Sequence, residues 1–114
     1  MEYTVEEKSF AFSVRIVNAY KHLAEAKREF VLSKQLLRCG TSIGANVAEA
    51  QQGQSRADFI SKLSIALKEA YETNYWLRLL YATNYLSKPE FSSLIDDCQE
   101  IEKMLTAIIK SSKS

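Results

Sequence analysis

Apolar residues recur three, four and seven positions apart along most of the chain, which is the spacing of positions on one face of an α-helix. Polar residues that favour helix starts interrupt this pattern. Together, periodicity and start signals predict four helices within a single domain, 1–114. The expected helices span about residues 4–29, 33–52, 55–86 and 88–110.

The start signals have a common chemistry, because each places a hydroxyl where it can accept from a free backbone amide. Thr4-Val-Glu-Glu7 and Ser87-Lys-Pro-Glu90 have the spacing of a capping box, in which the glutamate reaches back to the first residue. Pro89 suits a first helical turn, where its missing N–H does no harm. Ser33 and Ser55 are the expected N-caps of the second and third helices.

Short connections between consecutive helices favour antiparallel neighbours, so the expected fold is all-α, an antiparallel up-down four-helix bundle. Composition agrees, since three Gly and one Pro are too few for a fold rich in tight turns. The alternative architecture is a helical hairpin that completes its bundle by dimerising.

The stretch CGTSIGAN, residues 39–46, carries two glycines four positions apart. A phosphate-binding P-loop needs G-x-x-x-x-G-K-[ST], and a dinucleotide fingerprint needs G-x-G-x-x-G after a strand, so neither pattern fits. A helix whose small residues permit close approach of another helix fits better. The cost of interior glycines predicts that tertiary contacts hold this helix in place.

A polar stripe on the second helix is expected to meet a stripe on the third. Arg38 is the expected partner of Glu69 or Glu72, with hydrogen bonds from neighbouring hydroxyl and amide groups. The alternative is a set of solvated surface charges. Since a tryptophan and small residues share these faces, we favour a buried or interfacial network and a homo-oligomer. The proposed network comprises Arg38, Ser42, Asn46, Glu49, Glu69, Glu72 and Trp76.

Few residues suggest catalysis. His22 is the only histidine, and Cys39 and Cys98 lack the spacing of a zinc or redox motif and are expected in the core. We therefore expect no enzyme activity, cofactor or metal site. No window is long and apolar enough for a membrane span, so we expect a cytoplasmic protein without a membrane partner.

The formal net charge of +1 gives no general attraction to polyanions, so nucleic-acid binding would need local clustering. A basic stripe on the first helix offers one candidate, which would be repeated in each subunit of a homo-oligomer. The alternatives are a solvated helix face, or a scaffold that docks a partner protein. The candidate residues for binding RNA or DNA are Lys8, Arg15, Lys21, His22, Lys27 and Arg28.

Several motifs resemble the bacterial four helix bundle protein family, named for the protein encoded in intervening sequences of 23S ribosomal RNA genes. The matching segments are QLLR (35–38), TSI (41–43), NVAEA (46–50), DF (58–59), KLSIALKEA (62–70) and ET-x-YWL (72–77). The chain is similar, more distantly, to the accessory variability determinant protein of diversity-generating retroelements. The resemblance implies a ring-shaped homopentamer without known catalysis. The retroelement relatives are strongly basic and bind nucleic acid and a reverse transcriptase, whereas this chain is nearly neutral.

Overall fold

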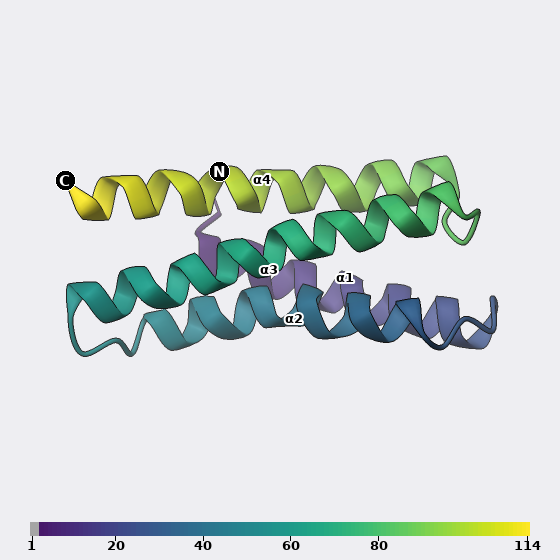
Figure 1. Ribbon diagram of the computed structural model, residues 1–114, viewed down its shortest axis with the longest axis horizontal. Helices are drawn as coiled ribbons and strands as arrows, with labels where there is room; N and C mark the ends of the chain where they lie inside the picture. The colour runs from purple at the N-terminus through teal and green to yellow at the C-terminus, as the bar shows by residue number, and fades with distance from the viewer. Residues whose placement is uncertain (1–2) are drawn as a thin grey trace.

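The computed structural model describes residues 3–114 and contains four helices in this range, with no strand. Consecutive helices run in opposite directions and lie side by side in an elongated bundle of 44 × 24 × 23 Å (Figure 1). Each helix packs on its neighbours in the sequence, and α4 also meets α1, so that α1 and α3 lie diagonally across the bundle. The helices are α1 (Val5–Glu25), α2 (Leu32–Ala50), α3 (Arg56–Ala82) and α4 (Lys88–Lys113).

The four-helix bundle expected from the sequence is therefore confirmed, and one chain supplies all four helices, unlike the alternative hairpin. Both capping boxes are present, at Thr4 with Glu7 and at Ser87 with Glu90. Ser55 accepts from the amide of Asp58, as an N-cap should. The core is apolar, and its largest fully buried side chains come from all four helices.

The glycines of α2 let α1 approach closely. A Cβ atom built at Gly40 would lie 2.8 Å from two carbons of Ile16, and one at Gly44 would lie 3.1 Å from the backbone oxygen of Ser9. The stretch 39–46 is helical, as predicted. The glycine-bearing side of this stretch faces α1 of the same chain, so the close contact that the glycines permit is intramolecular. The close packing of α2 on α1 also fixes the orientation of α2, and with it the face that carries Arg38 toward α3.

The prediction for the first connection was wrong. The first helix ends at Glu25 instead of residue 29, and Arg28 has a positive φ of 57°, which ends the helical path. Ser33 is not the N-cap of α2, because it lies inside the helix and its hydroxyl donates to the carbonyl of Glu29 at 2.7 Å. The Glu29 carboxylate caps the helix instead. It accepts from the amides of Val31, Leu32 and Ser33 at 3.1, 3.0 and 2.7 Å.

The other helix ends also differ from the sequence prediction by a few residues. Helix α3 ends at Ala82 instead of residue 86, because Asn84 takes a left-handed φ of 68° and turns the chain. Leu86 is then free to pack into the core. Helix α2 spans Leu32–Ala50 instead of 33–52, and α4 continues to Lys113.

Candidate interaction surfaces

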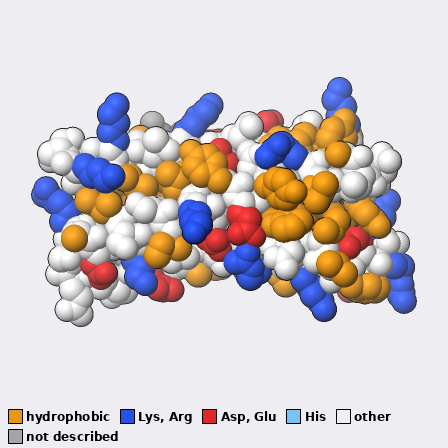
Figure 2. All heavy atoms as spheres, in the orientation of Figure 1, with side chains coloured by type: hydrophobic (Ala, Val, Ile, Leu, Met, Phe, Trp, Pro, Cys, Tyr) orange, Lys and Arg blue, Asp and Glu red, His pale blue; other side chains and the backbone are white. Residues whose placement is uncertain are grey.

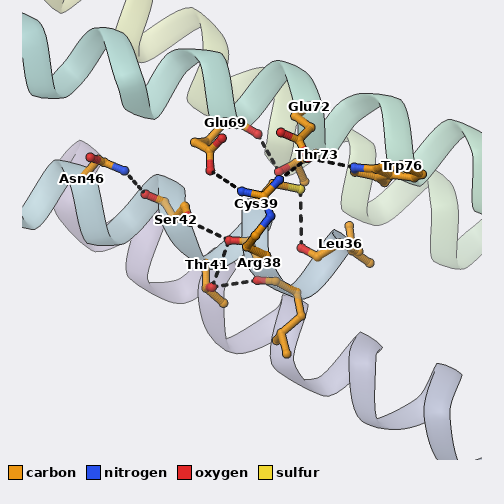
Figure 3. Close-up of polar contacts among 11 residues, drawn as sticks. Leu36, Arg38, Cys39, Thr41, Ser42, Asn46, Glu69, Glu72, Thr73 and Trp76 are labelled. Carbon is orange, nitrogen blue, oxygen red and sulfur yellow. Dashed lines mark hydrogen bonds and ion pairs between the residues drawn. The ribbon is translucent and has the colours of Figure 1, made fainter. Parts of the chain in front are cut away.

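An ion-pair network joins α2 to α3 on one side of the bundle. The guanidinium of Arg38 lies 3.3 Å from Glu69 Oε2 and 2.5 Å from Glu72 Oε2 (Figure 3). The indole Nε1 of Trp76 donates to the same Glu72 oxygen at 3.0 Å. The pairing of Arg38 with both glutamates agrees with the contact expected from the sequence. Arg38 makes these contacts within its own subunit.

The network fixes the charge of its central carboxylate. The hydrogen bond from Trp76, followed by the one from Arg38, lowers the pKa of Glu72 below its ordinary value, against the opposing effect of burial. The hydrogen bond to Glu72 in turn raises the pKa of Arg38. Arg38 remains 54% exposed, so solvent screens much of this attraction. The arrangement holds Trp76 and Arg38 in defined positions at the surface.

Three other residues of the predicted network do not join it. Ser42 donates to the backbone oxygen of Arg38 at 2.6 Å, and Asn46 donates to the backbone oxygen of Ser42 at 2.8 Å. Both side chains therefore bond to their own helix, a common alternative for short polar side chains. Glu49 forms a separate ion pair with Lys62 of α3, with 3.1 Å between its Oε1 atom and the lysine Nζ atom.

The basic stripe on α1 faces a row of acidic residues on α4. Lys8 lies 2.9 Å from Glu100, and Arg15 lies 2.6 Å from Asp97. Arg15 also donates to the backbone oxygen and the hydroxyl of Ser93. These pairs bridge the two helices, which pack on each other less extensively than the other neighbouring pairs do. Two of the six predicted nucleic-acid-binding residues are thus paired within the chain.

His22 completes this row at a longer distance, with its Nε2 atom 3.7 Å from a carboxylate oxygen of Glu90. The remaining three candidate cations, Lys21, Lys27 and Arg28, form no ion pair with any residue in the range 3–114. They are exposed and lie near the end of α1 and in the connection to α2.

Two exposed apolar surfaces were missed in the sequence. On α1, Phe10 is 72% exposed and Val14 is 48% exposed. On α3, Tyr71 and Tyr75 are about half exposed, and Tyr75 meets Trp76 edge to face at 5.1 Å between ring centroids. Figure 2 shows apolar side chains gathered on the face formed by α2 and α3, beside charged groups. The sequence did contain a signal for both surfaces, because these apolar residues recur at helical spacing on positions outside the core-facing stripe of each helix.

The two thiols, the side chains most suited to nucleophilic chemistry, are buried in this fold. Burial raises the pKa of the Cys39 thiol to about 11 and raises that of Cys98 further. Both cysteines are free and buried, so neither presents a thiolate to solvent. Among residues 3–114 there is no group of three His, Cys, Asp or Glu side chains that could hold a metal ion. In the same range, no helix is long and apolar enough to cross a membrane.

The sequence profile of the 23S rRNA-intervening sequence protein family matches residues 1–107, nearly the whole chain. The chain belongs to this family. A solved structure from Bacteroides thetaiotaomicron, described as a protein with unknown function from the S23 ribosomal protein family, has 59% sequence identity. It aligns with a TM-score of 0.92 over 93% of this chain and 95% of that one. No curated protein matches the chain. Membership of the 23S rRNA-intervening sequence protein family confirms the resemblance seen in the motifs, while the more distant one to retroelement proteins stays a prediction.

Proposed function

We propose that the protein is a non-catalytic subunit that assembles with copies of itself, head to tail, into a closed ring. The observation that carries this proposal is the pair of exposed apolar surfaces on α1 and α3, which lie diagonally across the bundle. Large exposed apolar side chains in a cluster are typical of interaction sites. Two different surfaces favour a heterologous contact, and heterologous contacts generate rings when the rotation closes.

The resemblance to the four helix bundle family implies that five subunits close the ring. In this proposal the Phe10 side of α1 packs on the Tyr75 side of the next subunit's α3. The Arg38 network borders that α3 surface and supplies a polar rim, which restricts how the two surfaces can be aligned. A non-catalytic role fits the buried cysteines and the presence of a single histidine in the sequence.

The test uses two variants that each block one surface. Phe10→Asp and Tyr75→Asp place a carboxylate at an exposed position, so the fold of each subunit should persist. Light scattering after gel filtration should show an assembly for the wild-type protein and monomers for each variant. Val31→Asp is the matched control, because Val31 is 71% exposed but lies outside both surfaces. It should assemble as the wild type does.

Mixing the two variants tests the head-to-tail geometry. Each variant keeps one intact surface, so a heterologous contact predicts a complex of one copy of each. An isologous contact predicts instead that the variant with its self-pairing surface intact forms a homodimer on its own, and that mixing adds no further complex. A monomeric wild-type protein would refute assembly and would favour the alternative function, a scaffold that docks a different protein on these surfaces.

We propose association with nucleic acid as a second function, and the observation that favours it is the group of cations outside ion pairs. Lys21, Lys27 and Arg28 belong to this group, whereas Lys8 and Arg15 are neutralised by α4. Fluorescence anisotropy with a labelled structured RNA at low and high salt tests this function. Phosphate recognition predicts binding at low salt that weakens as salt is added. An RNA affinity that does not change with salt concentration would contradict phosphate recognition.

A further inference from the structure

Of the eleven Lys and Arg side chains outside the ion pairs in the range 3–114, six lie at one end of the bundle. This end holds the connection from α1 to α2 and the connection from α3 to α4, both at the right of Figure 1. Figure 2 shows Lys and Arg side chains projecting from this end and also from the opposite end. The exposed cations there are Lys21, Lys27, Arg28, Lys34, Arg78 and Lys88.

The local charge differs from that of the whole chain. Residues 21–34 and 78–90, which form this end, contain six Lys and Arg against three Glu, whereas the whole chain has a formal net charge of only +1. Two of the three carboxylates also have partners on the protein. Glu29 caps α2, and Glu90 caps α4 and lies beside His22. Cations therefore dominate the solvent-facing surface of this end.

Aromatic rings are exposed among these cations. The Phe30 ring is 45% exposed, and the guanidinium of Arg28 lies 5.5 Å from its centroid. Beside the second connection, Tyr81 in the last turn of α3 stacks on Phe91 in the first turn of α4, with ring centroids 4.5 Å apart and an interplanar angle of 7°. Tyr81 is itself 37% exposed. Exposed rings beside cations are the arrangement that binds unpaired nucleotides, because bases stack on the rings and phosphates pair with the cations.

We propose that this end of the bundle, which we call the basic end, binds an unpaired segment of nucleic acid, with RNA and DNA sharing the required chemistry. The inference rests on the proposed association with nucleic acid and specifies both its location and its ligand. Arg28, Lys34 and Lys88 contact phosphates, while Phe30 and Tyr81 stack on bases. The basic end replaces the α1 stripe, whose Lys8 and Arg15 are paired with α4.

The experiment compares two triple variants that remove the same number of charges. Arg28→Gln, Lys34→Gln and Lys88→Gln neutralise the basic end. Lys103→Gln, Lys110→Gln and Lys113→Gln are the matched control, because these exposed lysines lie in the C-terminal half of α4, away from the basic end. Binding of a labelled 20-nucleotide single-stranded RNA is measured by fluorescence anisotropy at 50 and 200 mM salt. The same measurement is made with single-stranded DNA, with duplex RNA and with a structured RNA.

Three phosphate contacts predict that the wild-type Kd for single-stranded RNA rises about 20-fold between the two salt concentrations. The basic-end variant should bind at least about 10-fold more weakly and lose most of this salt dependence, while the control changes less than about twofold. Phe30→Ala should weaken binding to single strands by about 5-fold or more and leave duplex binding unchanged, since a duplex offers no free base to stack.

Equal weakening by both triple variants would overturn the assignment to the basic end. Binding of structured or duplex RNA without binding of single strands would overturn the ligand proposed here, yet leave the proposed association with nucleic acid intact. No binding of any nucleic acid at 50 mM salt would overturn both. Light scattering on each variant separates these outcomes from any loss of assembly.

Discussion

Glu29 offers a sharp test of how the structure holds α2, because one side chain satisfies three backbone amides. Its carboxylate accepts from Val31, Leu32 and Ser33 and is buried in the first connection. In Glu29→Ala, all three amides lose their partner. Val31 is exposed, so water can reach its amide, whereas Ser33 is fully buried and its amide would stay unsatisfied.

These partners set the size of the expected effect. An unsatisfied buried donor costs about 1–3 kcal/mol, and loss of a helix N-cap costs about 1 kcal/mol. Since these contributions overlap, we expect Glu29→Ala to lower the free energy of unfolding by about 2–3 kcal/mol. Glu29→Gln retains an accepting oxygen but loses the charge, so about 1 kcal/mol is expected.

Urea unfolding, followed by circular dichroism at one fixed protomer concentration, measures these changes without a contribution from altered mass action. Glu25→Ala is the control, because Glu25 is an exposed glutamate in the last turn of α1 and should change stability by less than about 0.5 kcal/mol. A Glu29→Ala protein as stable as the Glu25→Ala protein would refute the capping role.

The same carboxylate predicts a pH dependence. Burial alone would raise the pKa of Glu29, but the hydrogen bonds from Ser33, Leu32 and Val31 together hold it below its ordinary value. A carboxyl whose pKa is lower in the folded state stabilises the fold above its unfolded pKa, and this stabilisation disappears as the pH falls through the folded pKa. The stability difference between wild type and Glu29→Gln should therefore shrink between about pH 5 and pH 3. A constant difference would contradict this linkage.

Three further predictions concern single contacts. Gly40→Ala should lower the free energy of unfolding by about 1–2 kcal/mol despite the better helix propensity of alanine, because its Cβ would lie 2.8 Å from fully buried Ile16. Urea unfolding of Gly40→Ala with and without Ile16→Ala should show strong coupling, and additive losses would contradict the contact. A double-mutant cycle on Arg38 and Glu72 should give a coupling of about 0.5 kcal/mol or slightly more, and a coupling near zero would mean that solvent screens the pair completely. In the folded protein at pH 7.5, Cys39 should react with an aromatic disulfide reagent at least about 100-fold more slowly than in urea, because burial raises its pKa to about 11, and equal rates would contradict its burial.

The fold was accessible from the sequence because its strongest signals are local. The capping boxes at Thr4 and Ser87 and the apolar periodicity depend only on residues within a few positions of each other. The capping of α2 in the first connection could not be predicted from such local signals. Ser33 has the residue type of an N-cap, but a left-handed Arg28 brings Glu29 into position to cap α2 first. Which of two nearby capping groups prevails depends on the path of the turn.

The candidate surfaces were predictable only in part. Arg38 and the glutamates of α3 could be paired because helical wheels orient them toward neighbouring helices that follow each other in the chain. The partners of Lys8 and Arg15 lie on α4, more than 80 residues away, and their register depends on how α1 and α4 are packed. Exposed Phe10 was overlooked because a wheel shows the core stripe of a helix but not which other apolar residues remain uncovered.

The proposed assembly surfaces and the basic end occupy different parts of the molecule, which links the two proposed functions. Phe10 and Tyr75 project from the sides of a bundle 44 Å long, whereas Arg28 and Lys88 lie at one end of it. Arg78 lies 5.8 Å from the Tyr75 ring and borders the assembly surface. Head-to-tail assembly through the sides therefore leaves the Arg28 and Lys88 part of each basic end uncovered and repeats it once per subunit. A short RNA that occupies one basic end should bind monomeric Phe10→Asp as tightly as the wild type. A longer RNA that reaches several subunits should bind the assembled wild type at least about 10-fold more tightly, because later contacts become intramolecular. Equal affinity for both lengths, measured by anisotropy, would show that assembly does not gather the basic ends into one binding surface.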